Sequence, residues 1–439
     1  MRSEARVGAT RRLGEQERLF HYLHGYGGLI PVQVLHIRGR LDPDLARRAL
    51  DWLQRRYALL RAHIRYGELV FRDLPPFAYR QPWFDLEGTG PIPLEVVTDP
   101  DPEAWRRVLD RELGKPLQKG RNPRLRALLV REGPDAPACR FFLTADHAIA
   151  DAQATNMASR DFMAYLADPA AAEAMPLPST AAELPPPLEF GMPKRSDSGT
   201  KGYQPALRLP PQKVKGGKQI SRHIERRVDP AATAALKECV KQKRTTLHGA
   251  MSAAYLLAIR DKYGLGEMTT LSTIDLRRLC KPPFPSSTYG CYIDLLRTRH
   301  DISGDFWSIA RDVSFGLITT VAKDQEAASI MKLFDWEVYR KELWPTITHQ
   351  RRIDGLAMTT AGESGLVEDY GPFTLERVTM AVSSVMFGAS FFVITSERLG
   401  GLDIYTCYAD YALERGNAED LADRAVAHLR EAARVPVGA

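Results

Sequence analysis

A segment rich in proline, glycine and serine divides this sequence into two parts. It covers residues 169–218, and its apolar residues follow neither a helical nor a strand period. Such a segment connects folded regions and does not form one itself. We therefore expect two lobes, over residues 1–168 and 219–439, joined by a crossing linker. A chain of 439 residues with 44% hydrophobic residues can bury a core in each lobe.

Both parts alternate short apolar runs with longer amphipathic runs. The short runs predict strands, and apolar residues at every third or fourth position predict helices. Strands are expected at 32–37, 125–130, 140–144, 219–226, 391–396 and 402–408. Helices are expected from Pro43, from near Asp151, and at 103–113, 230–243, 246–260 and 418–432. This alternation predicts an α/β protein with two lobes.

The composition excludes several classes of protein. Charged residues make up 26% of the chain and the formal net charge is +6. This excess is too diffuse for a nucleic-acid partner, although it suits phosphates or an acidic carrier surface. The five cysteines are far apart, odd in number and without a CxxC pair. That spacing argues against a disulfide framework or a zinc knuckle and favours a reducing compartment.

Hydropathy gives no sign of a membrane span. One of the longest apolar stretches, residues 250–259, is too short to cross a bilayer. The N-terminus is rich in arginine but is followed by no apolar segment, so we expect no signal peptide. These features predict a cytoplasmic protein.

A histidine follows one of the predicted strands. The stretch FFLTADHAIADAQATNMASRDFMAYLAD places His147 after the strand, and Asp151 four residues later. A neutral imidazole is suited to accept a proton near pH 7. If the segment is helical, Asp151 shares a face with His147 and orients it. If it is a loop, Asp151 turns inward or caps the next helix. A packed histidine and a simple helix cap would give the same short pattern.

Further motifs occur along the chain in a particular order. They are HIRGRLDPDLARRALDWLQRRYALLRAHI, KPLQKGRNPRLRALLVRE, HAIAD, TTLHGAMSAAYLLAI, LSTIDLRRL and YGCYID. In this order, from about Leu13 to Ala432, the chain resembles the chloramphenicol-acetyltransferase-like superfamily. This group includes condensation domains and HxxxD acyltransferases. The resemblance is greatest to the free-standing acyltransferases of the mycobacterial phthiocerol dimycocerosyl transferase type, which esterify polyketide lipids.

The resemblance implies a fold and a mechanism. The fold has two chloramphenicol-acetyltransferase-like lobes, each with a mixed sheet flanked by helices, and an active-site tunnel between them. His147 would be the general base for a hydroxyl or amine that attacks a thioester. Asp151 would form a structural ion pair with Arg277, or less favourably with Arg278. The implied co-substrate is acyl-coenzyme A or a phosphopantetheinyl thioester on an acyl carrier protein, with no bound cofactor.

Candidates for stabilising the oxyanion, or for lining the tunnel, are hydroxyl residues. Thr360 and Ser364 lie in MTTAGESG, and Ser384 lies in VSSVMFG. The alternative interpretation of each is a solvated or structural hydroxyl. The sequence has no HExxH, GxSxG, GxGxxG or GxxxxGK[ST] motif, and we expect no metal.

Two departures from the condensation-domain motif bear on the reaction. Asp146 stands where condensation domains usually carry a first histidine, and Ala152 replaces their glycine. We therefore expect a discrete, monomeric enzyme that transfers an acyl group to a small-molecule alcohol in natural-product or lipid biosynthesis. The alternatives are amide formation on an amine, and a catalytically silent module that docks carrier proteins.

Overall fold

A computed structural model describes most of the chain in two compact units. The described residues are 8–73, 76–178, 181–188, 207–210, 219–280, 282–323, 352, 354–385 and 388–434. Unit 1 takes the described residues of Met1–Met192, Arg277–Tyr292 and Gly365–Met380. Unit 2 takes those of Pro193–Leu276, Ile293–Ser364 and Ala381–Ala439. The chain therefore returns to unit 1 twice after entering unit 2.

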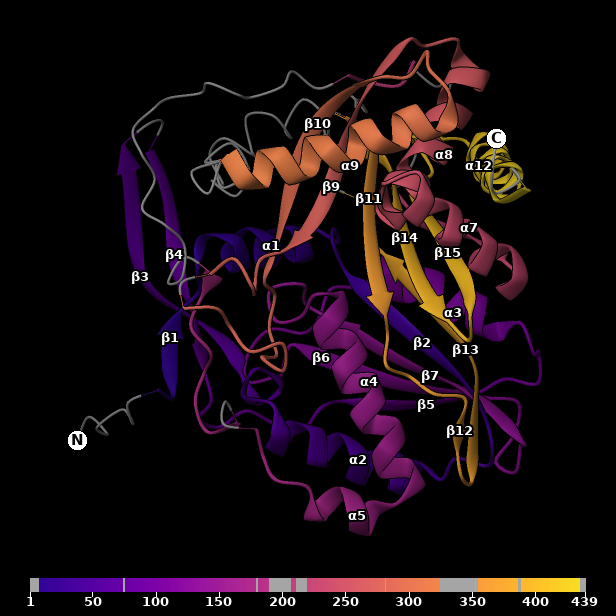
Figure 1. The fold of residues 1–439 in the computed structure, drawn as a ribbon. Helices are drawn as coiled ribbons and strands as arrows, with labels where there is room; N and C mark the ends of the chain where they lie inside the picture. The colour runs from indigo at the N-terminus through magenta and orange to yellow at the C-terminus, as the bar shows by residue number, and fades with distance from the viewer. Residues whose placement is uncertain are drawn as a thin grey trace. The chain divides into compact units, whose positions relative to one another are not determined.

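Unit 1 is built on a six-stranded mixed sheet (Figure 1). The strand order is β12 (Asp369–Tyr370), β13 (Phe373–Val382), β2 (Pro31–Arg38), β7 (Ala138–Ala145), β6 (Leu125–Arg131) and β5 (Leu94–Thr98). β7 is antiparallel to both β2 and β6, and β5 is parallel to β6. The second return of the chain supplies β12 and β13. A separate three-stranded sheet has the order β1 (Thr10–Arg12), β4 (Pro76–Asp85) and β3 (His63–Asp73).

Helices cover both faces of the unit 1 sheet. α4 (Ala152–Ala167) lies on one face and α3 (Ala104–Leu113) on the other. The other described helices of this unit are α1 (Glu15–Gly25), α2 (Pro43–Arg56), α5 (Pro169–Ala174) and the 3-10 helix η1 (Ala58–Arg61). On one face, Phe162 of α4 stacks on Phe141 of β7 with ring centroids 4.1 Å apart. On the other face, Trp105 of α3 meets His36 of β2 edge-on at 4.8 Å. His36 and Phe141 belong to opposite faces because side chains alternate along a strand and His36 is paired with Arg140.

Unit 2 is also built on a mixed six-stranded sheet. The order is β10 (Ile293–Asp301), β9 (Glu267–Asp275), β11 (Asp354–Glu363), β14 (Ala389–Arg398), β15 (Gly401–Ala409) and β8 (Ser221–Val228). β11 is parallel to both of its neighbours, and the remaining pairs are antiparallel. The helices are α7 (Pro230–Gln242), α8 (Leu247–Tyr263), α9 (Phe306–Lys323) and α12 (Arg415–Arg434).

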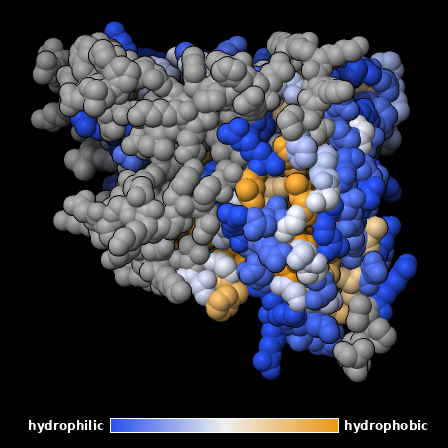
Figure 2. All heavy atoms as spheres, turned by 90° about the horizontal axis from the view of Figure 1, so that it is seen from above, coloured by the Kyte–Doolittle hydropathy of each residue, from blue (hydrophilic) through white to orange (hydrophobic). Residues whose placement is uncertain are grey.

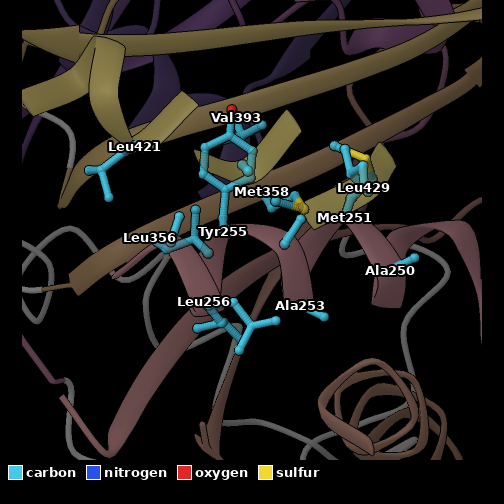
Figure 3. Close-up of a cluster of buried hydrophobic side chains, with 14 of the residues drawn as sticks. Ala250, Met251, Ala253, Tyr255, Leu256, Leu356, Met358, Val393, Leu421 and Leu429 are labelled. Carbon is cyan, nitrogen blue, oxygen red and sulfur yellow. The ribbon is translucent and has the colours of Figure 1, made fainter. Parts of the chain in front are cut away.

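The core of unit 2 surrounds α8. Residues 249–259 of this helix are all buried, on every side, as expected for a helix enclosed by other elements. Figure 3 shows Met251 and Tyr255 of α8 together with Met358 of β11, Val393 of β14 and Leu429 of α12. α9 and α12 pack along α8. The alanines of α8 let these neighbouring helices approach closely, because a methyl group is the smallest side chain beyond glycine.

The predicted fold class is confirmed: the protein is α/β, with two mixed sheets flanked by helices. In the described part of the surface shown in Figure 2, most residues are hydrophilic and a small group is hydrophobic. Among the described helices, none is both long and apolar enough to cross a membrane.

Candidate active site

His147 lies in a tight turn at the end of β7. A backbone hydrogen bond from Ile149 N to Asp146 O (3.0 Å) closes the turn, and Asp146 Oδ1 accepts another from Ala148 N (3.0 Å). Asp146, Ala148 and Ile149 are buried, whereas His147 keeps partial exposure. The neighbours of His147 thus anchor the turn in the core, whereas His147 itself is half-buried.

Two residues contact the His147 ring. The ring of Phe20, from α1, lies 4.8 Å away between centroids and is tilted by 44°. The thiol of Cys291 lies 3.5 Å from Nδ1. Among the described residues, no side chain hydrogen-bonds to Nε2. One ring nitrogen therefore faces a thiol, and the other faces no described side chain.

Burial lowers the pKa of His147 below its ordinary value of 6.5. Hydrogen bonding to the backbone at His147 and Ala150, and the negative charges of Asp151 and Asp146, oppose this effect. The lowered pKa keeps the imidazole neutral at pH 7, and a neutral imidazole can accept a proton.

Asp151 does not reach towards the His147 ring, because backbone groups occupy its carboxylate. Its Oδ1 accepts from Ala154 N (2.9 Å), which caps the N-terminus of α4. Its Oδ2 accepts from Tyr292 N (3.0 Å). Asp151 therefore fixes the helix to the returning segment that carries Tyr292.

Arg277 forms an ion pair with Asp151. Their closest contact joins Nη1 to Oδ2 at 2.8 Å, and Nη2 donates to Oδ1 at 3.1 Å. Arg277 is only 1% exposed and is among the largest fully buried side chains of the described chain. It also donates to the carbonyls of Thr288 (3.2 Å) and Gly290 (3.0 Å). Arg278, the less favoured partner, is exposed.

The two interpretations of Asp151 in the sequence are therefore compatible. The same carboxylate caps α4 and pairs with Arg277. Removing one partner of a buried ion pair leaves the other charge unpaired, at a cost of about 3–5 kcal/mol. This pair thus holds residues 277–292 in unit 1.

The three hydroxyl candidates belong to unit 2, whereas His147, Asp151 and Arg277 belong to unit 1. Thr360 lies on β11, where its Oγ1 is 3.0 Å from Nδ1 of His248. Ser364 follows the end of β11 and is partly exposed. Ser384 is 1% exposed, and its Oγ has no hydrogen-bond partner among the described residues.

Several residues around His147 escaped the sequence analysis. Phe20 and Cys291 contact the ring, and His21 binds the adjacent Asp146. Nothing in the YGCYID motif marks its cysteine as a neighbour of His147. Arg124 also lies close to the turn and is buried against Asp146.

No group of three or more histidine, cysteine, aspartate or glutamate side chains in the described ranges could hold a metal ion. All five cysteines are buried and lie outside any disulfide bond.

One protein family matches part of the sequence, and several solved structures resemble the fold over almost the whole chain. Residues 218–349 match the family described as phthiocerol/phthiodiolone dimycocerosyl transferase C-terminus. No curated protein matches the chain by sequence.

Three solved structures illustrate the likeness in fold. Trichothecene 15-O-acetyltransferase TRI3 from Fusarium sporotrichioides is 10% identical with a TM-score of 0.71, over 97% of this chain and 95% of that chain. Polyketide synthase associated protein 5 from Mycobacterium tuberculosis is 15% identical with a TM-score of 0.63, over 94% and 97%. The first condensation domain of the CDA synthetase is 16% identical with a TM-score of 0.66, over 97% of each chain.

These likenesses confirm the resemblance predicted from the motifs. The chain has the two-lobed fold of the condensation-domain and chloramphenicol-acetyltransferase-like acyltransferase superfamily.

Proposed function

We propose that this protein is an acyltransferase that moves an acyl group from a coenzyme A or carrier-protein thioester to a hydroxyl acceptor. The observation that carries the proposal is the state of His147. Its Nδ1 atom lies 3.5 Å from the thiol of Cys291, and no described side chain hydrogen-bonds to its Nε2 atom. A histidine with a lowered pKa and one ring nitrogen without a side-chain partner is suited to act as a general base.

The reaction needs one proton carrier and no bound cofactor. Nε2 of His147 takes the proton of the acceptor hydroxyl as its oxygen attacks the thioester carbonyl carbon. The tetrahedral oxyanion then collapses, the carbon–sulfur bond breaks, and the leaving thiolate takes the proton from His147. The products are an ester and a free thiol, and the imidazole is neutral again.

Asp151 has a structural role in this scheme. With both oxygens engaged by α4, Tyr292 and Arg277, its carboxylate fixes the turn that carries the base. Its negative charge also raises the pKa of His147, and this partly offsets the effect of burial.

The hydroxyl candidates remain proposed oxyanion donors or lining residues. The oxygen of Thr360 can accept from Nδ1–H of His248, while Ser272 donates to Nε2 of the same ring (3.0 Å). In that tautomer the proton of Thr360 is free to point at another acceptor. Ser384 and Ser364 stay weaker candidates, because Ser384 is buried and the role of Ser364 rests on the motif alone.

An ester product is favoured over an amide for two reasons. The match to the dimycocerosyl transferase family and the shared fold with a 15-O-acetyltransferase both point to hydroxyl acceptors. In addition, Asp146 replaces the first histidine of the condensation-domain motif. Comparing a small alcohol with the amine of the same shape would separate the two reactions.

The test is release of free thiol from a panel of acyl-coenzyme A thioesters, with mixed alcohol and amine acceptors. Acceptor-dependent release by the wild type, lost in a folded His147→Ala variant, would support the proposal. If neither protein releases thiol, the assay is repeated with an acylated carrier protein as donor. If the wild type again releases no thiol but binds the carrier tightly, the proposal is overturned and a docking module is favoured.

A further inference from the structure

We propose that Asp146 is a positioning residue for His147: its buried carboxylate joins the turn that carries the base to α1 and to Arg124. This inference rests on the proposed function, since His147 must be the base for its position to matter. Asp146 is 0% exposed, so its carboxylate is shielded from bulk water and needs hydrogen-bond partners in the interior.

One oxygen of Asp146 acts on the turn itself. Oδ1 accepts from Ala148 N at 3.0 Å, and this bond spans His147 in the sequence. It fixes the backbone on the C-terminal side of His147, while a bond from Asp146 N to Arg124 O (2.9 Å) fixes the N-terminal side. The Cα position of His147 is thereby restrained from both directions.

The other oxygen acts on neighbouring elements. Oδ2 accepts from His21 Nδ1 (2.7 Å), and from Arg124 at both Nη2 (2.8 Å) and Nε (3.1 Å). His21 and Arg124 are themselves buried. Burial would raise the pKa of Asp146, but electrostatic interactions with His24, Arg124 and His21, and the hydrogen bond from His21, hold it well below its ordinary range. The carboxylate therefore stays ionised and can accept all of these hydrogen bonds.

α1 supports the turn twice in consecutive residues. Phe20 packs on the imidazole of His147, and His21 binds the carboxylate next to it. Tyr66 of β3 completes the chain of contacts, because its hydroxyl lies 2.8 Å from His21 Nε2. A shift of α1 would thus move both the ring contact and the anchor of the turn.

A carboxylate fits this place better than the histidine of condensation domains would. Asp146 accepts four hydrogen bonds, from Ala148, His21 and twice from Arg124. A neutral imidazole has one acceptor nitrogen and could not replace them. Arg124 and His21 therefore supply donors that suit an aspartate, rather than a histidine, at position 146.

The experiment compares Asp146→Asn with Asp161→Asn. Asp161 is a matched control, a buried carboxylate of unit 1 that accepts from Arg56 Nε (3.0 Å) and Tyr57 Oη (2.7 Å). Both variants should lower the Tm. Only Asp146→Asn should lower kcat, by about 10- to 100-fold with KM within about twofold, because a displaced base slows the chemical step and leaves ground-state binding intact.

A second measurement does not depend on turnover. The imidazole NMR signals of histidine-labelled protein, with His147 assigned from its absence in His147→Gln, should shift for His147 in Asp146→Asn and stay unchanged in Asp161→Asn. If Asp146→Asn fails to fold, His21→Ala replaces it. That variant keeps Arg124 and the Ala148 bond, and it should still lower kcat about three- to tenfold.

The outcomes separate this inference from the proposed function. Equal kcat losses in Asp146→Asn and Asp161→Asn, with no shift of the His147 signal, would overturn the positioning role and leave acyl transfer intact. A wild type that shows no activity with either donor would overturn the proposed function, whereas the NMR comparison would still report on the turn.

Discussion

Each unit places a partly exposed histidine near the N-terminal end of a helix, and the two histidines have opposite surroundings. His248 lies in the first turn of α8, which Thr246 caps by accepting from Gly249 N. Both of its ring nitrogens face hydroxyls, those of Thr360 and Ser272, each at 3.0 Å. His147 has a thiol near one nitrogen and, among the described residues, no side-chain partner at the other.

The charges around the two rings also differ. Burial lowers the pKa of His248 to about 4, and no charged group opposes it. For His147 the same effect of burial is opposed by the carboxylates of Asp151 and Asp146. A histidine near a helix start therefore becomes a candidate base through its carboxylate neighbours and a ring nitrogen without a side-chain partner, not through its place in the fold.

Replacing each histidine in turn gives the largest expected contrast. His147→Gln should lower kcat about 10²–10⁴-fold, because the general base is lost. His248→Gln should lower it less than about tenfold, because its effect must pass through Thr360. Steady-state thiol release, measured on variants with matching circular dichroism spectra, checks this. Equal losses of kcat in the two variants would contradict the different roles of His147 and His248.

The ion pair that supports His147 gives the next effect. Arg277→Ala should lower the free energy of unfolding of the cooperative unit containing α4 by about 3–5 kcal/mol, because Asp151 is left buried and unpaired. The exposed Arg278 is the matched control, and Arg278→Ala should change it by less than about 0.5 kcal/mol. Urea denaturation measures both. A variant Asp151→Ala that is inactive yet has wild-type stability would contradict the structural role of this carboxylate.

The pH dependence of catalysis tests the role of His147 separately. Because the pKa of His147 is lowered, its neutral form persists below pH 6.5. The kcat/KM should therefore be flat near neutrality and fall in acid with a midpoint below 6.5. An acid limb centred above 6.5 in the pH–rate profile would exclude His147, in these surroundings, as the base.

The smallest effect concerns stability in acid. His248 has a folded pKa of about 4 against an ordinary value of 6.5, so the unfolded chain binds its proton first as the pH falls. Its contribution to stability is complete above pH 6.5 and is lost progressively towards pH 4. Replacing it by glutamine should flatten the decline of unfolding free energy across this window. Urea titrations at pH 7 and pH 5 would show the change, and parallel declines would argue against it.

Local patterns predicted much of the fold. Asp42 and Pro43 marked the start of α2, and the apolar run after Thr246 marked α8. In both cases the signal lies within a few neighbouring residues, as a cap or a helical period. The order of the motifs then pointed to the pair of Asp151 with Arg277, which the structure contains.

The sequence could not predict the contacts that depend on distant pairing. His21 meets Asp146 across 125 positions, and Thr360 meets His248 across 112. Neither pair has a local pattern, because each side chain is placed by a different element. For the same reason, linear boundaries between lobes could not anticipate that residues 365–380 add two strands to unit 1.

The return of the chain to unit 1 has a consequence for biosynthesis. Arg277 follows Asp151 by 126 positions, so at about 5–20 residues per second the ribosome delivers the arginine roughly 6–25 seconds after the aspartate. β12 and β13 emerge later still. Unit 1 therefore cannot close until these segments have left the ribosome. A nascent chain stalled before residue 277 should expose the HAIAD turn to proteases and chaperones, and release from this state should require the C-terminal half of the molecule.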